Sequence, residues 1–79
     1  MDKVIYSLTS EKYVKEYPIS GLLDGWFFRY QEIAPGVYLL EGIDEGGHSV
    51  SRICAEREID AALKSCARDA REIEYQLAN

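Results

Sequence analysis

The sequence predicts one small α+β domain over residues 1–79, in which a three- to four-stranded antiparallel β-meander packs against a C-terminal amphipathic α-helix. Two patterns predict this class. Apolar residues alternate along the middle of the chain, and they recur every three or four positions toward its end. A chain of 79 residues buries only about 60 to 65% of its unfolded surface, which allows one core and no second domain.

The first 24 residues leave two interpretations open. The apolar segment from Val4 to Leu8 fits a strand. The segment from Ser10 to Tyr17 fits a short helix, with Ser10 as its N-cap and Pro18 just past its end. A strand fits this second segment nearly as well, because large side chains also alternate between positions 13 and 19. The N-terminal element is therefore expected to be a strand or a short helix.

Three strands joined by two short turns are predicted next. The first contains the alternating aromatic residues from Trp26 to Tyr30, and it ends at the Ala34-Pro35-Gly36 stretch. Proline presets φ and glycine accepts positive φ, so this stretch predicts a turn. The second strand runs from Val37 to Ile43, and the turn-forming residues 44–47 separate it from a third, His48 to Cys54. Sequential strands with short connections indicate a meander.

A helix from about residue 56 to 77 is the clearest element. Its apolar residues follow the spacing of one helix face; they are Ile59, Ala62, Leu63, Cys66, Ala70, Ile73 and Leu77. Acidic residues fall in its first turns, where the positive end of the helix dipole favours them. We expect this apolar stripe to be buried against the sheet.

Both faces of the predicted sheet carry apolar residues. If Trp26, Phe28 and Tyr30 face the helix, then Phe27 and Ile33 point to the opposite side. Register decides which of Tyr38, Leu40 and Ile53 join them. One helix covers one face, so the second needs cover from the N-terminal segment, another copy of the chain or a partner. We expect a homodimer that hides part of this second face.

The net charge of −5 resides in the middle of the chain. Residues 24–60 hold eight acids and three bases, whereas the remainder is neutral overall. Binding to phosphates depends on Lys and Arg, so direct nucleic-acid binding is not expected. A protein partner with a basic surface is expected instead, provided that the fold brings the second turn and the helix start to one edge. The predicted partner-binding residues are Glu41, Asp44, Glu45, Glu56, Glu58 and Asp60.

No pattern in the sequence predicts catalysis, a cofactor or a metal site. His48 lies in a Gly-Gly-His-Ser turn without a nearby nucleophile, and Gly42, Gly46 and Gly47 are interpreted as turn glycines. Cys54 and Cys66 have no CxxC spacing; buried reduced thiols are the simpler interpretation, and a disulfide between them stays open. Without an apolar run of about 20 residues or a secretory signal pattern, a cytoplasmic protein that does not enter the membrane is expected.

Weak resemblances accompany these observations. If the segment from Ser10 to Tyr17 is helical, the order helix, three strands, helix is similar to that of double-stranded RNA-binding domains, but Glu56-Arg57-Glu58 stands where those domains place lysines, so RNA binding is not carried over. A hairpin followed by a strand and a helix loosely resembles small antitoxin domains of the HicB type. In size and charge the chain resembles anti-CRISPR proteins, immunity proteins and nucleic-acid mimics of phages and mobile elements. We therefore expect a non-enzymatic binding or inhibitor protein, with a self-associating structural or regulatory subunit as the alternative.

Overall fold

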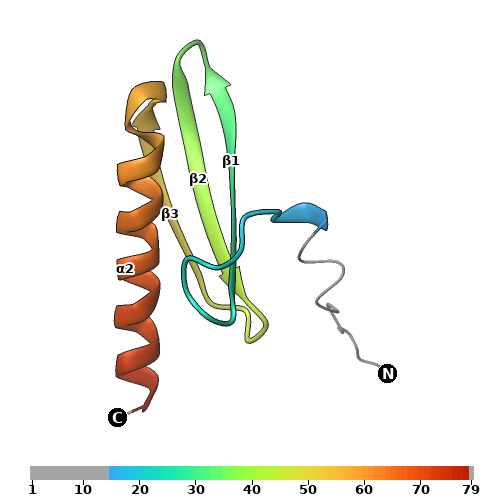
Figure 1. Ribbon diagram of the computed structural model, residues 1–79, viewed down its shortest axis with the longest axis vertical. Coiled ribbons are helices and arrows are strands. Elements are labelled where there is room, and N and C mark those ends of the chain that lie inside the picture. Colours follow the sequence, from blue (N-terminus) through green and yellow to red (C-terminus); the bar gives the residue numbers. More distant parts are fainter. Residues whose placement is uncertain (1–14, 79) are drawn as a thin grey trace.

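Residues 15–78, which the computed structural model describes, form a three-stranded antiparallel sheet with a long helix packed on one face (Figure 1). The strands are β1 (Trp26–Ala34), β2 (Val37–Asp44) and β3 (Ser49–Ala55), and they lie in that order in space. A 3₁₀ turn, η2 (Glu56–Glu58), leads directly into α2 (Ile59–Ala78). The predicted α+β class, with its meander and C-terminal helix, is confirmed.

Both turns of the meander lie where the sequence places them. Gly36 has a φ of 73° and Gly47 a φ of 88°, values that L side chains rarely adopt. The register of β1 and β2 shifts between Glu32 and Ala34, so Ile33 forms a β-bulge just before the first turn. This bulge is a feature that the alternating pattern does not predict.

The register assigns each side chain to one sheet face. Phe28 lies opposite Gly42, and Gly42 lies opposite Val50, so these three residues share the face that α2 covers. A Cβ atom at Gly42 would overlap the Phe28 ring, so only a glycine leaves room for the ring at this position. The buried core between sheet and helix comprises Trp26, Phe28, Leu40, Ala62, Leu63, Cys66 and Ala70.

The helix begins and ends close to the predicted positions. Leu63 is buried, as expected, and Ile59 and Ile73 pack against the core while remaining partly exposed. Leu77, however, is 61% exposed, so the prediction that it is buried was wrong. The reason is length: the indole N–H of Trp26, the first residue of β1, reaches Glu74, and beyond that level α2 continues past the sheet (Figure 1).

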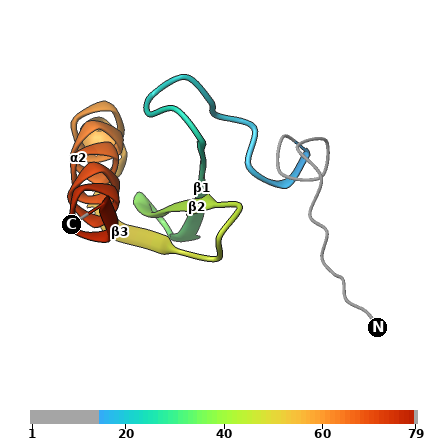
Figure 2. The same cartoon turned by 90° about the horizontal axis from the view of Figure 1, so that it is seen from below.

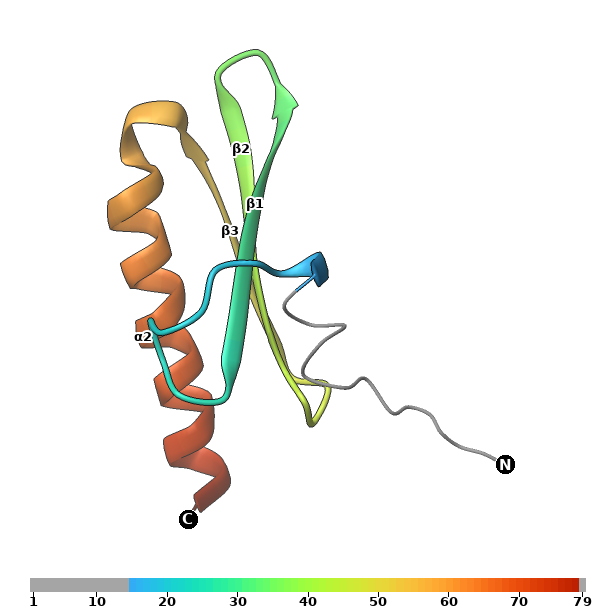
Figure 3. The same ribbon diagram turned by 45° about the vertical axis from the view of Figure 1, so that its right-hand side comes forward.

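The N-terminal part of the described chain lies along the free side of β1. Ile19 and Phe28 exchange two backbone hydrogen bonds of 2.9 and 2.8 Å. Figure 3 shows this segment passing β1, and Figure 2 shows residues near 15 on the side of the sheet away from α2. Lys15 and Glu16 are helical. Residues 10–14 of the expected element, and the possible strand from Val4 to Leu8, lie outside the described residues.

Candidate protein-interaction surfaces

The six acids predicted to bind a partner are distributed over three regions. Asp44 and Glu45 lie at the β2–β3 turn, whereas Glu56, Glu58 and Asp60 lie beyond the other end of β3, a separation of roughly 20 Å at about 3.3 Å per strand residue. Glu41 lies between them in the middle of β2, opposite Arg29. The structure therefore does not bring the second turn and the helix start to one edge.

A different set of acids does gather at the helix start. The first turn of the meander lies there, because the Glu56 N–H donates a 3.2 Å hydrogen bond to the carbonyl of Gly36. Glu32, at the end of β1, accepts a 3.0 Å hydrogen bond from the Gly36 N–H. We call Glu32, Ile33, Glu56 and Glu58 the acidic end. Sequence analysis missed Glu32 and Ile33 as site residues.

The acidic end is exposed and shaped by two shallow depressions. One is lined by the turn residues from Glu32 to Pro35, and the other by Gly36, Ala55, Glu56 and Arg57. The bulged Ile33 is 49% exposed, so an apolar side chain lies beside the carboxylates. Acidic and apolar groups are thus available at the same surface.

Tyr38 reports the electrostatic character of this end. Partial burial raises the pKa of its hydroxyl, and the negative charges of Glu32 and Glu56 raise it further. The ring also makes an edge contact with Tyr30, with a centroid distance of 5.9 Å. Because the carboxylates of Glu32 and Glu56 both act on the Tyr38 hydroxyl, the end of β1 and the end of β3 lie in one region of negative potential.

At the second turn, the side chain of Asp44 has a structural role. Asp44 accepts a 2.8 Å hydrogen bond from the backbone N–H of His48 and lies 3.0 Å from the His48 ring Nδ1. These contacts close the loop that carries Gly46 and Gly47. Asp44 therefore stabilises the turn, and His48 is held by it.

The second sheet face, away from α2, mixes an ion pair with apolar residues. Arg29 Nε lies 2.9 Å from Glu41 Oε1, and the Arg29 guanidinium lies over the Tyr17 ring at 4.2 Å. Phe27, Leu39 and Ile43 are partly buried on this face, as the register requires. Ile53 on β3 is 66% exposed. The described part of the N-terminal segment, from residue 15 onward, therefore reaches the β1 side of the face and does not cover Ile53.

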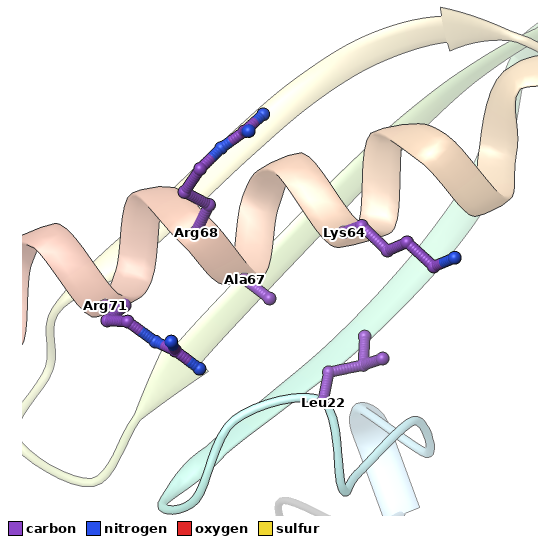
Figure 4. A pocket seen from close by; sticks show the side chains of 5 residues that line it. All are labelled: Leu22, Lys64, Ala67, Arg68 and Arg71. Carbon is purple, nitrogen blue, oxygen red and sulfur yellow. The ribbon is translucent and has the colours of Figure 1, made fainter.

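A basic groove runs between α2 and the loop before β1 (Figure 4). It has a volume of about 300 Å³ and is lined by Leu22, Lys64, Ala67, Arg68 and Arg71. Figure 4 shows Lys64 and Arg71 extending on the side of α2 that faces Leu22, whereas Arg68 points away. No acid among residues 15–78 forms an ion pair with Lys64 or Arg71. The chain is acidic overall, yet this side is positive.

The cysteines are unbonded. Cys66 is fully buried under the sheet, and burial raises the pKa of its thiol, which opposes formation of the reactive thiolate. Within the described residues, no three His, Cys, Asp or Glu side chains are grouped so that they could hold a metal ion. Over the same part of the chain, no helix has the length and apolar character that crossing a membrane requires.

Comparisons with protein-family models, with curated proteins and with solved structures found no match for the chain. The surfaces described above are therefore interpreted from their own geometry.

Proposed function

We propose that the chain is a non-enzymatic binding protein of the inhibitor type, which acts on a basic protein surface through its acidic end. One observation carries the proposal: the β-bulge leaves Ile33 exposed next to Glu32, at the end of the molecule where Glu56 and Glu58 begin the helix. β-Bulges frequently redirect a side chain at functional positions. An apolar anchor beside charged groups is the arrangement that protein interfaces use.

The two kinds of group have different roles in this proposal. Exposed carboxylates contribute little binding free energy, but they accelerate encounter with a basic surface and make that rate dependent on salt. Ile33 supplies apolar area that is removed from water once the partner is in place. The basic groove is lined by Leu22 and by residues 64–71 of α2, and it shares no residue with the acidic end.

A photo-crosslinking residue at position 33 tests whether this end contacts a protein in the cell. The same residue at position 77, which is also exposed and lies on the last turn of α2, is the control. We expect position 33 to capture a basic protein that position 77 does not capture. Identical products from both positions, or none from position 33, would contradict the proposal.

Association kinetics with the captured protein then test the charges. In the triple variant Glu32→Gln, Glu56→Gln and Glu58→Gln, the amide oxygens can still accept the hydrogen bonds that Gly36 and Ala55 donate. The matched control, Glu16→Gln, Asp24→Asn and Glu72→Gln, changes the net charge equally at exposed positions. We expect the first triple to slow association about tenfold at low salt and to flatten its salt dependence, and the control to change the rate less than about twofold.

The alternative is a self-associating structural or regulatory subunit without enzymatic activity. The exposure of Ile53 on the second sheet face supports it, because an isoleucine in a strand is usually covered. Light scattering at micromolar concentration tests the alternative: a strictly monomeric mass would exclude it, whereas a dimeric mass is compatible with both functions, because the binding protein requires neither state.

A further inference from the structure

The two edges of the sheet are treated differently by the chain. The edge of β1 is covered in part. Phe28 exchanges two backbone hydrogen bonds with Ile19, and the backbone N–H of Trp26 donates a 3.1 Å hydrogen bond to the carbonyl of Leu23. No described residue pairs with the outer side of β3 in the same way. An uncovered edge strand is a template for pairing with another strand.

The hydrogen-bond pattern identifies which backbone N–H and C=O groups of β3 have no partner in β2. Glu56 bonds to Gly36 at one end of the β2–β3 ladder, and Asp44 bonds to His48 at the other. In an antiparallel ladder, bonded and non-bonded positions alternate, so the even-numbered residues of β3 bond inward to β2. The backbone N–H and C=O groups of Ser49, Ser51 and Ile53 therefore point outward. Ala55, the next odd-numbered residue of β3, differs from these three, because its N–H already donates a 3.3 Å hydrogen bond to the Glu58 side chain.

β3 carries few of the features that commonly protect an edge strand. β3 contains neither Pro nor Lys, the residues with which edges are commonly protected, and its outward-bonding positions carry two serines and one isoleucine. All three residues are exposed. A groove of about 280 Å³ lies between this edge and α2, and its lining includes Ile53, Ala61 and Ser65.

We propose that the edge of β3 pairs antiparallel with the same edge of a second copy of this chain, with the two Ser51 residues facing each other across a two-fold axis. Ser51 then exchanges two hydrogen bonds with its counterpart. Ser49 of each copy exchanges two with Ile53 of the other, because these residues are equidistant from Ser51. All the free groups of the three residues are satisfied, and the two sheets become one sheet of six strands.

Charge complementarity favours a second copy over an unrelated strand. Arg52, next to Ser51, forms a 3.2 Å ion pair with Asp69 of α2, and the two side chains are 45% and 43% exposed. In the proposed dimer the two Arg52 residues are diagonal neighbours about 8 Å apart, within the reach of long side chains. Each Arg52 can then approach Asp69 of the other copy as well as its own. The charges of the two Arg52 and two Asp69 residues sum to zero, so this part of the interface carries no net charge.

This inference does not rest on the acidic end, since β3 positions 49–53 are not part of that surface. The first measurement is amide hydrogen exchange of the full chain as a function of its concentration. We expect the amides of Ser49, Ser51 and Ile53 to become protected as concentration rises, in parallel with the mass from sedimentation equilibrium. Fast exchange of these amides with a monomeric mass up to millimolar concentration would overturn the proposal, and so would protection that is independent of concentration, because the chain would then cover its own edge.

The second measurement uses Ser51→Pro, which removes the outward N–H and places a ring where the second copy must approach. Proline is tolerated on a strand edge whose N–H faces solvent, so the monomer is expected to fold. Ser51→Ala keeps the N–H and is the control. We expect Ser51→Pro to weaken dimerisation at least a hundredfold, Ile53→Lys to weaken it also, and Ser51→Ala to change it less than about threefold. A dimer that survives both Ser51→Pro and Ile53→Lys would place the interface elsewhere and overturn the proposal.

Discussion

Trp26 shows what a single residue contributes to this fold. It is 1% exposed, it stacks beside Phe28 with ring centroids 6.4 Å apart, and its indole N–H donates a 2.6 Å hydrogen bond to Glu74. A buried indole needs a partner for its polar atom, and Glu74 provides one from a position 48 residues later in the chain. The first strand and the end of α2 are thereby connected.

Removal of this acceptor tests the contact. Glu74→Ala should lower the free energy of unfolding by about 1 kcal/mol, because the indole N–H of Trp26 loses its charged acceptor; Glu74 is itself exposed, so water can replace part of this hydrogen bond. Glu72→Ala, at an exposed position of the same helix, should change stability by less than about 0.5 kcal/mol. Urea denaturation followed by the fluorescence of Trp26 measures both. Equal stabilities of the two variants would show that the hydrogen bond contributes nothing.

Residue-level features were the hardest to obtain from the sequence. The alternation of Trp26, Phe28 and Tyr30 correctly assigned side chains to a face, but no local pattern indicates that Phe28 lies over Gly42 or that Trp26 reaches Glu74. Both contacts depend on register and on the placement of α2, which are properties of the folded chain. Gly42 looked like a turn glycine and is instead a buried residue of β2.

At the scale of elements, α2 owes its stability to one face. Ala62, Leu63, Cys66 and Ala70 are buried, which is the stripe that the three-and-four spacing predicts. The small residues Ala62, Cys66 and Ala70 let the helix approach the sheet closely, and Leu63 supplies most of the volume. The stripe ends earlier than its sequence pattern because the sheet ends.

Substitutions of two leucines on α2 distinguish the buried part of the stripe from its exposed end. Leu63→Ala should cost roughly 2 to 5 kcal/mol, the range for a large-to-small change in a core, because Leu63 lies among buried neighbours. Leu77→Ala should cost less than about 0.5 kcal/mol, because that side chain is already largely in water. Chemical denaturation midpoints report both changes. An unchanged midpoint for Leu63→Ala would remove the argument that the stripe is the core.

The elements were predictable, but their mutual placement was predicted only in part. Alternation, turn glycines and helical spacing identified the three strands, both turns and α2. The condition that the second turn and the helix start meet at one edge is not fulfilled, and the order of the strands explains why. In a meander of three strands, the first turn and the end of the third strand lie at the same end, so Glu56 lies beside Gly36 and away from Asp44. That rule was available from the order of strands and would have added Glu32 to the candidate site.

In the molecule as a whole, negative and positive charges are concentrated in different regions of the surface. The acidic end, the turn held by Asp44 and the basic groove beside Leu22 lie in separate places, so a net charge of −5 hides regions of both signs. Folding also changes the proton affinity of one group in the core, the thiol of Cys66. Cys66, between sheet and helix, has its pKa raised from 9.0 chiefly by burial, while Arg52 opposes part of that rise.

This linkage predicts alkaline sensitivity. The folded chain holds the Cys66 proton more tightly than the unfolded chain does, so its stabilising contribution is complete below the ordinary pKa of 9.0 and is lost as pH rises above it. The free energy of unfolding should fall above pH 9 by at most about 1.4 kcal/mol per pH unit for this one group. Cys66→Ala should be less stable at pH 7 but should show a shallower fall. Cys54→Ala, which retains Cys66, should keep the steep fall, and identical slopes in all three proteins would exclude Cys66 as the cause.

The meander also determines the order in which the fold can be assembled. Each strand pairs with the strand next to it in the chain through a short turn, and α2 follows β3 without a long connection, so most of the sheet forms by closing small loops. Loops of this size close quickly, and proteins rich in local contacts fold rapidly. The hydrogen bond between Trp26 and Glu74 is different, because it must close a loop of 48 residues. It follows that the last turns of α2 dock late in folding and are the part of the helix that detaches first when the protein begins to unfold.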